Sequence, residues 1–147
     1  MKAIEQVKAL AERAVVLGLE GLEMFGYVSM ETAAQEYNGI GPEYLNPDVR
    51  DSVTMRLQLF EPAALLHDLR NYLSDGTRWA FEHANDEFLR NCRKCANAAY
   101  PWWSLRRWRA RAVAKLMYDF VASKFGWKAW MDCYYKAQNK TKQRSES

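Results

Sequence analysis

The chain has 147 residues, 49% of them apolar, which is enough for one domain with a substantial core. Its net charge of +3 conceals an asymmetry, because residues 1–91 carry 8 Lys and Arg against 15 Asp and Glu, whereas residues 92–147 carry 13 against 3. No apolar stretch is long enough to span a bilayer, and the N-terminus lacks a signal-peptide core. We therefore expect a protein of the reducing cytoplasm, either free or peripheral to a membrane. Its basic last third favours an anionic partner.

Apolar residues at three- and four-residue spacing predict an all-α fold, a small helical bundle in one domain over residues 1–135. A first helix is predicted over residues 3–25, ended by Gly26. Ser29 is a suitable N-cap for a short helix that follows it. Residues 38–48, NGIGPEYLNPD, hold the chain's one concentration of Gly and Pro and are predicted to form a loop.

Four further helices are predicted after this loop, over residues 49–60, 62–73, 77–99 and 105–125. Pro62 suits the first turn of its helix, because the missing N–H is not needed there. Ser104 is the predicted N-cap of the last helix and Gly126 its predicted end. Residues 136–147 are polar, lack apolar anchors and are predicted to form a disordered tail.

A histidine and an aspartate, His67 and Asp68, follow one another inside the predicted helix 62–73. Their side chains point about 100° apart, so they do not pair with each other. Asn85 falls in the middle of the apolar face of the next helix, where an unpartnered amide costs about 1–3 kcal/mol. We therefore expect His67 and Asn85 to meet across an antiparallel helix pair at about 3 Å. The plainer interpretation of His67-Asp68 is a satisfied surface or boundary pair on an amphipathic helix.

Three segments in this order resemble the phospholipase A₂ superfamily, and most closely its small cysteine-poor phage, bacterial and viral members: Asn38-Gly39-Ile40-Gly41-Pro42, His67-Asp68 and Asn85-Asp86-Glu87-Phe88. The resemblance implies that Asp68 and the carbonyls of Gly39, Ile40 and Gly41 bind Ca²⁺. It also implies that His67 activates a water molecule for attack on the sn-2 ester of a phospholipid. The residue types suit these roles, because Ca²⁺ takes oxygen ligands and a neutral imidazole is a competent base.

The chain departs from the superfamily at Asn85, where an aspartate is usual, and at Tyr72, one position after a customary supporting tyrosine. An asparagine oxygen can orient the His67 ring but brings no charge to stabilise its protonated form. The corresponding Asp-to-Asn change in a serine-protease triad lowers turnover roughly 10⁴-fold. Asp86 can take the place of Asn85 as the partner of His67 only if the helix is rotated by about 100° from the predicted orientation.

Two alternative functions follow from these departures. The first is a catalytically inactive, phage-type binding protein on the same scaffold, which engages a membrane or a host component through its basic aromatic last third. The second is a metal-dependent phosphohydrolase of the His-Asp type. That chemistry fits less well, because it needs a histidine upstream of the pair, and His83, the one other histidine, lies downstream.

Five of the six tryptophans lie in the basic last third, among arginines and lysines. Tryptophan favours membrane interfaces and basic residues favour anionic headgroups, so contact with a phospholipid surface is predicted. A protein partner is an alternative, and nucleic acid is a weaker one. The predicted contact residues are Trp102, Trp103, Arg106, Arg107, Trp127 and Trp130.

Two other patterns in the same region are interpreted as parts of the core. A stripe at helical spacing is predicted to pack inward, namely Leu105, Trp108, Ala112, Leu116 and Phe120. Cys92 and Cys95 are predicted to be core or near-core thiols rather than a metal or redox pair, because a single Cys-x-x-Cys is a weak metal signal.

Overall fold

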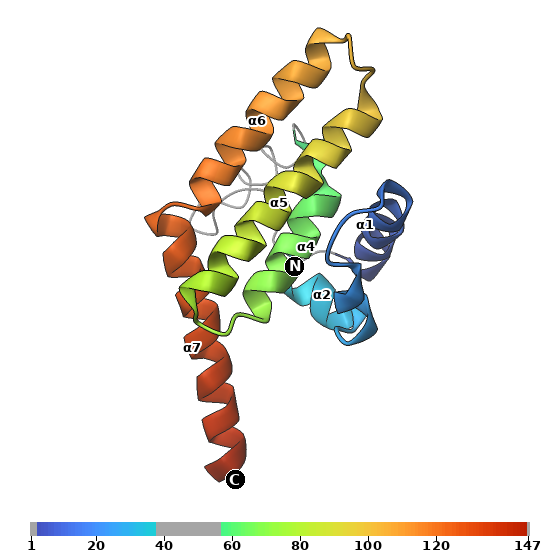
Figure 1. Ribbon diagram of the computed structural model, residues 1–147. Coiled ribbons are helices and arrows are strands. Elements are labelled where there is room, and N and C mark those ends of the chain that lie inside the picture. Colours follow the sequence, from blue (N-terminus) through green and yellow to red (C-terminus); the bar gives the residue numbers. More distant parts are fainter. Residues whose placement is uncertain (1–2, 38–56, 147) are drawn as a thin grey trace.

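The computed structural model describes residues 3–37 and 57–146, and within them it holds six α-helices and no strand (Figure 1). The helices are α1 (Ile4–Leu17), α2 (Met30–Glu36), α4 (Glu61–Tyr72), α5 (Arg78–Ala99), α6 (Leu105–Val121) and α7 (Lys124–Glu146). Two short 3₁₀ helices, Leu22–Gly26 and Gln58–Phe60, precede α2 and α4. The predicted all-α class is confirmed for this part of the chain.

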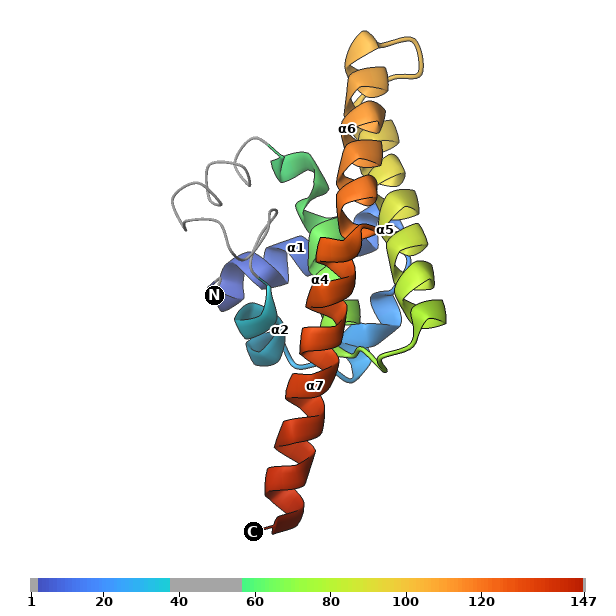
Figure 2. The same ribbon diagram turned by 90° about the vertical axis from the view of Figure 1, so that its left-hand side faces the viewer.

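Helices α4, α5 and α6 form successive antiparallel layers, each joined to the next by a short turn (Figures 1 and 2). α1 and α2 pack against α4 on the side away from α6, and α7 packs against α4 and α6. No helix among the described residues is both long and apolar enough to cross a membrane. The order places α4 and α5 at the centre, where their facing side chains are shielded from water.

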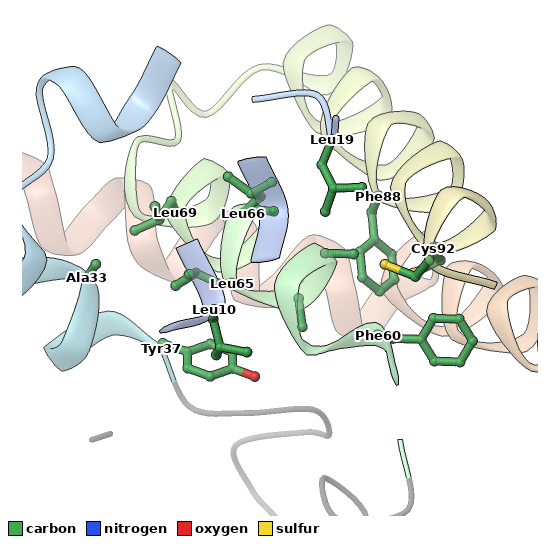
Figure 3. Packing of buried hydrophobic residues seen from close by; sticks show 14 of the residues in the cluster. Leu10, Leu19, Ala33, Tyr37, Phe60, Leu65, Leu66, Leu69, Phe88 and Cys92 are labelled. Atoms are coloured by element: carbon green, nitrogen blue, oxygen red, sulfur yellow. The ribbon is translucent and has the colours of Figure 1, made fainter. Parts of the chain in front are cut away.

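The core lies between α1, α2, α4 and α5, and Figure 3 shows its packing. Leu65, Leu66 and Leu69 of α4 are fully buried, and they belong to the same core cluster as Phe88 and Cys92 of α5. A second cluster joins Phe81 and Ala84 of α5 to Trp130 of α7. Each leucine removed from water contributes about 1.5–3 kcal/mol, so the α4–α5 interface is a main source of stability.

Local capping signals set several helix starts as the sequence predicts. The side-chain oxygen of Ser29 accepts a hydrogen bond from the Thr32 N–H at the start of α2. Ser104 caps α6 in the same manner, and Pro62 lies in the first turn of α4. The caps satisfy N–H groups that have no partner inside the helix.

The first helix ends earlier than predicted. α1 stops at Leu17 because Gly18 adopts a left-handed conformation with φ 64°, and its N–H bonds back to the Ala14 and Val15 carbonyls. The Leu19 N–H bonds to the Ala14 carbonyl as well, which completes a Schellman motif. Residues beyond this turn form a separate 3₁₀ helix ending at Gly26, so the prediction of one helix over residues 3–25 is wrong.

The segment before α4 differs from the prediction, whereas α4 itself starts at Glu61, one residue before its predicted start. Residues 49–56 of the predicted helix 49–60 lie outside the described residues, and its end forms the short 3₁₀ helix Gln58–Phe60. The predicted helix 62–73 corresponds closely to α4, and the predicted helix 77–99 to α5.

Gly126 lies inside α7 rather than ending the preceding helix, which is a correction to the sequence prediction. α6 ends at Val121, and α7 begins three residues later. α7 then continues through Glu146, so residues 136–146, predicted to be disordered, are helical with exposed side chains. Lys, Gln and Arg in this stretch are good helix formers, and they favour the extension although no apolar residue anchors it.

We expect Gly126→Ala to lower the free energy of unfolding by about 1–3 kcal/mol, the usual cost of forcing an extra methyl group into a packed site. A β-carbon at Gly126 would overlap the backbone carbonyl of Val121, so the turn between α6 and α7 must shift. Urea unfolding measures the effect. Gly26→Ala is the matched control, because a β-carbon there meets no atom within 4 Å. Equal stability of the two variants would show that the turn adapts freely.

Candidate functional site

His67 of α4 and Asn85 of α5 form a hydrogen-bonded pair at the centre of the molecule. Nε2 of His67 lies 3.0 Å from Oδ1 of Asn85, the distance that the sequence predicts for this pair. The exposed fractions of the two residues are 8% and 2%. Helix spacing puts His67 on the inner face of α4 and Asn85 on the inner face of α5. Because α4 and α5 are antiparallel neighbours, the two inner faces meet and bring these side chains together.

The surroundings of His67 favour an uncharged ring. The Phe88 ring lies 4.7 Å from the imidazole, centroid to centroid. Burial lowers the pKa of His67 below its ordinary value of 6.5, while the hydrogen bond to Asn85 opposes this shift. At neutral pH the ring is therefore neutral, the form that a general base requires.

The pKa of His67 is accessible to NMR, because His83→Gln leaves it as the one histidine in the chain. We expect its imidazole resonances to titrate with a midpoint below 6.5. Because the unfolded chain takes up this proton near pH 6.5, the contribution of His67 to stability is intact above that pH. It is lost as the pH falls toward the lower pKa of the folded state. A midpoint at or above 6.5 would contradict the buried neutral ring.

The side-chain amide of Asn85 has two possible orientations, and each one fixes a different tautomer of the His67 ring. If Oδ1 accepts, Nε2 carries the hydrogen and Nδ1 is free to take a proton from water. If the amide is turned, Nδ2 donates to Nε2, and Nδ1 then carries the hydrogen and is no base. In the structure Oδ1 faces the ring, and the buried Nδ2 has no hydrogen-bond partner within residues 3–37 and 57–146. The observed arrangement is the one that leaves Nδ1 available.

Asp68 lies one residue further along α4 and is partly exposed. Its carboxylate, together with that of Glu61, lies close enough to Tyr37 to add to the effect of burial, which raises the pKa of the phenol. Tyr37 is fully buried and donates a hydrogen bond of 3.0 Å to Oε1 of Glu61. Asp68 therefore lies near Tyr37, the last residue before the predicted glycine loop.

The predicted metal ligands Gly39, Ile40 and Gly41 lie outside the described residues. Within the described part of the chain, no three His, Cys, Asp or Glu side chains gather in an arrangement that could hold a metal ion. Asp68 supplies a hard oxygen ligand, as Ca²⁺ prefers, but by itself it makes no site. The donor set fits Ca²⁺ only if backbone carbonyls complete it.

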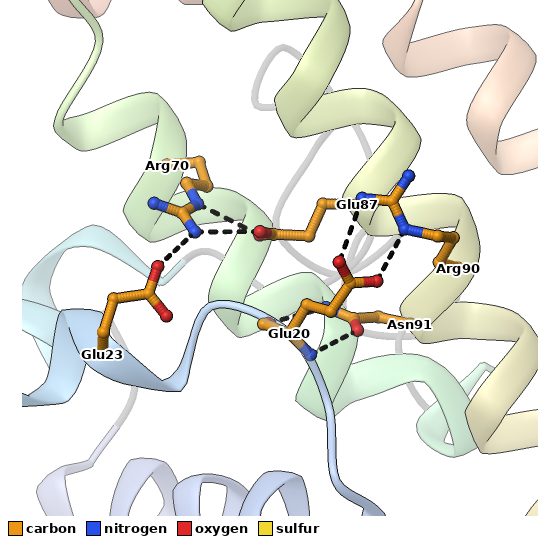
Figure 4. A network of polar contacts seen from close by, with 6 residues as sticks. All are labelled: Glu20, Glu23, Arg70, Glu87, Arg90 and Asn91. Carbon is orange, nitrogen blue, oxygen red and sulfur yellow. Dashed lines mark hydrogen bonds and ion pairs between the residues drawn. The ribbon is translucent and has the colours of Figure 1, made fainter.

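A network of polar contacts beside the pair was missed by the sequence analysis (Figure 4). Arg70 of α4 donates to both carboxylate oxygens of Glu87 on α5, at 3.1 and 2.8 Å, and to Glu23 at 2.7 Å. Glu87 is 9% exposed, so its charge is compensated almost entirely by the guanidinium. Glu87 lies about 200° around α5 from Asn85, among polar residues such as His83, Arg90 and Asn91, so the sequence pattern did not mark it as buried.

Asn91 holds the segment after α1 against α5 in the same network. Its Nδ2 donates to the Glu20 carbonyl at 3.0 Å, and the Glu20 N–H donates to its Oδ1 at 2.8 Å. Arg90 forms an ion pair with the Glu20 side chain, and Lys94 donates to the Gly18 carbonyl. A buried asparagine that satisfies both backbone polar groups of one residue fixes the position of that residue.

The two cysteines of the Cys-x-x-Cys pattern are buried in α5, as predicted for core thiols. Burial raises the pKa of Cys92, and it raises that of Cys95 to about 11. Both are therefore protonated and poorly reactive at neutral pH.

A groove of about 550 Å³ lies between α1 and the C-terminal end of α5, lined largely by apolar atoms. Its walls include Ala9, Arg13 and Val16 of α1 and Cys95 and Ala99 of α5. None of the predicted site residues lines it. The groove is therefore separate from the His67–Asn85 pair.

The predicted membrane-contact residues divide into two groups. Trp102 and Trp103 are 75% and 71% exposed, and Arg106 and Arg107 also reach the surface. Trp130 is 3% exposed and belongs to the cluster with Phe81, so its prediction as a contact residue is wrong. Trp127 is half-buried and packs edge-on against Phe81, and it is not a free contact residue either.

The apolar stripe of α6 that is predicted to pack inward faces the solvent instead, so this prediction is also wrong. Leu105, Trp108 and Leu116 are 64%, 61% and 68% exposed, and Ala112 and Phe120 are exposed too. The residues that pack inward are Ala110, Val113, Ala114, Met117 and Val121. Both sides of α6 carry apolar residues, and the side with the small ones allows α6 to approach α5 closely.

Comparisons with known proteins return no match, whether against protein-family models, curated proteins or solved structures.

Proposed function

We propose that this protein is a phospholipase A₂-like hydrolase that uses His67 as the general base for Ca²⁺-dependent cleavage of phospholipid sn-2 esters. The observation that carries the proposal is the 3.0 Å hydrogen bond between Nε2 of His67 and Oδ1 of Asn85, on antiparallel helices and next to Asp68. The resemblance of residues 38–92 to the superfamily supports it. The same proposal takes α4 and α5 as the helices that carry the site, and the loop that precedes them as the metal-binding loop.

In the proposed reaction the ring of His67 is held by Asn85 so that Nδ1 is free. Nδ1 takes a proton from a water molecule, whose oxygen attacks the ester carbonyl carbon. The imidazolium then returns the proton to the leaving alkoxide, which gives a fatty acid and a lysophospholipid. Asp68 and the carbonyls of residues 39–41 would hold Ca²⁺, and the bound ion would supply positive charge beside the ester carbonyl.

The test is the release of fatty acid from phosphatidylcholine vesicles and from vesicles that also contain phosphatidylglycerol, with Ca²⁺ or with EDTA. We expect release that needs Ca²⁺ and is lost in His67→Ala. His83→Ala is the matched control, because His83 is exposed and stacks on Trp79 away from Asn85. Release that survives His67→Ala, or that ignores EDTA, would contradict the proposed mechanism.

A second candidate function is a binding protein on the same scaffold that has no catalytic activity. The neutral Asn85 favours it, because this side chain brings no negative charge to stabilise a protonated His67, and its Nδ2 has no hydrogen-bond partner among the described residues. Absence of hydrolysis in the wild type and in Asn85→Asp would favour this function over the hydrolase.

A further inference from the structure

The outer face of α6 and the turn before it form an exposed aromatic and aliphatic surface. We call it the α6 outer face, and its members are Trp102, Trp103, Leu105, Trp108, Leu116 and Phe120. All are more than a third exposed, and the tryptophans are 61–75% exposed. Isolated exposed apolar residues are common in proteins, but a contiguous set of large ones indicates an interaction site.

Helix geometry explains why these side chains lie on one side. Leu105, Trp108, Ala112, Leu116 and Phe120 recur at three- and four-residue spacing, which keeps them on one face of a helix. Ala110, Ala114 and Met117 face the opposite way and pack on the core. In Figures 1 and 2, α6 lies at the side of the bundle, and no described helix covers it on the side away from α5. A helix of 17 residues is about 25 Å long, so the face is long and narrow.

The charges beside this face are mostly positive. Residues 101–118 include Arg106, Arg107, Arg109, Arg111 and Lys115 and no acidic residue. Arg106 and Arg109 are exposed, and the Arg111 guanidinium lies 6.0 Å from the Trp108 ring centre. The first acidic residue along α6, Asp119, forms an ion pair with Lys115. The surface that covers this face must therefore tolerate a dense positive charge.

We propose that the α6 outer face lies flat on an anionic phospholipid surface, with its tryptophans and leucines in the interface and its arginines among the headgroups. A second copy of the chain is a poor occupant, because two such faces would bring arginines against arginines. Single-stranded nucleic acid would use the arginines and tryptophans but gains nothing from Leu105 and Leu116. A phospholipid surface gives favourable contacts to all three kinds of side chain, the tryptophans, the leucines and the arginines. The proposal does not depend on hydrolysis.

Sedimentation with vesicles in EDTA tests the aromatic part of the surface without any enzyme activity. We expect the protein to bind vesicles of phosphatidylcholine with 30% phosphatidylglycerol far more strongly than phosphatidylcholine alone. The triple variant Trp102→Ala, Trp103→Ala, Trp108→Ala should bind at least about tenfold more weakly, because three interfacial side chains are lost. Trp79→Ala is the control, because Trp79 is 69% exposed but lies on α5. Equal losses in both variants would overturn the proposal.

The basic part is tested by Arg106→Gln with Arg109→Gln, which should weaken binding to the same vesicles by roughly 25-fold, at about fivefold for each arginine near the surface. Lys140→Gln with Lys142→Gln removes the same charge from the exposed end of α7 and should have much less effect. If both pairs weaken binding equally, net charge rather than the α6 outer face is responsible. Dimers that the triple tryptophan variant abolishes, or tighter binding to an oligonucleotide than to vesicles, would also overturn the proposal.

Discussion

Asn85→Asp is expected to raise the proposed Ca²⁺-dependent ester hydrolysis by roughly 10²- to 10⁴-fold, the reverse of the loss that Asp-to-Asn causes in a serine-protease triad. A carboxylate can only accept, so Nε2 of His67 must carry the hydrogen and Nδ1 must be the base. The new charge lies 3.0 Å from the ring, where it stabilises the imidazolium that forms during the reaction. Fatty-acid release from mixed vesicles at saturating Ca²⁺ measures the gain.

The control is the double variant His67→Ala, Asn85→Asp, in which the gain should disappear because the carboxylate acts through the ring. Circular dichroism and urea unfolding establish that each variant is folded. A folded Asn85→Asp protein with the wild-type rate would exclude this pair as the catalytic centre. The inactive binding scaffold would then be the better description of the protein.

Arg70→Met should lower the free energy of unfolding by about 2–3 kcal/mol, because it leaves the nearly buried Glu87 carboxylate without its guanidinium. The full cost of an unpaired buried charge is about 3–5 kcal/mol, and the 26% exposure of the Arg70 side chain reduces it. Equilibrium unfolding in urea gives the value, with an unchanged m-value showing that two-state behaviour is retained.

Arg90→Met is the matched control for this charge network. It removes the same charge from a pair with Glu20 whose side chains are 52% and 38% exposed, so we expect a loss within about 1 kcal/mol. Similar losses for the two variants would show that burial of Glu87 is not what makes the Arg70 contact important.

Signals that are local in the sequence predicted the structure well. Ser29, Pro62 and Ser104 mark helix starts because the side chain or ring acts on its own first turn. Glycine is less informative, since the sequence predicts helix ends at Gly26 and Gly126, whereas Gly18 ends α1 and Gly126 lies inside α7. A glycine ends a helix only where the following chain can turn away, and that depends on tertiary packing.

The choice between two apolar sides of α6 could not be made from the sequence. The larger residues, Trp108 and Leu116, have the stronger hydrophobic signal, yet the smaller Ala110 and Ala114 face the core. Close packing rewards shape as well as hydrophobicity, and the shape of α5 is not visible in the sequence of α6.

The candidate site was predicted in part for a related reason. His67 and Asn85 could be paired because each is the polar exception on an apolar helix face. The contacts of Arg70 with Glu87 and of Asn91 with Glu20 join positions 17 and 71 residues apart, and no pattern along the chain relates them.

The contact between Asn91 and Glu20 also sets an order for events during synthesis. Chains grow at about 5–20 residues per second, so roughly 4 to 14 s separate the translation of these two residues, which are 71 positions apart. Val7 and Leu10 of α1 belong to a core that α4 and α5 complete, so the apolar side of α1 is not fully covered until both helices have been made. Slower translation of residues 60–91 would therefore prolong the exposure of this apolar side to water.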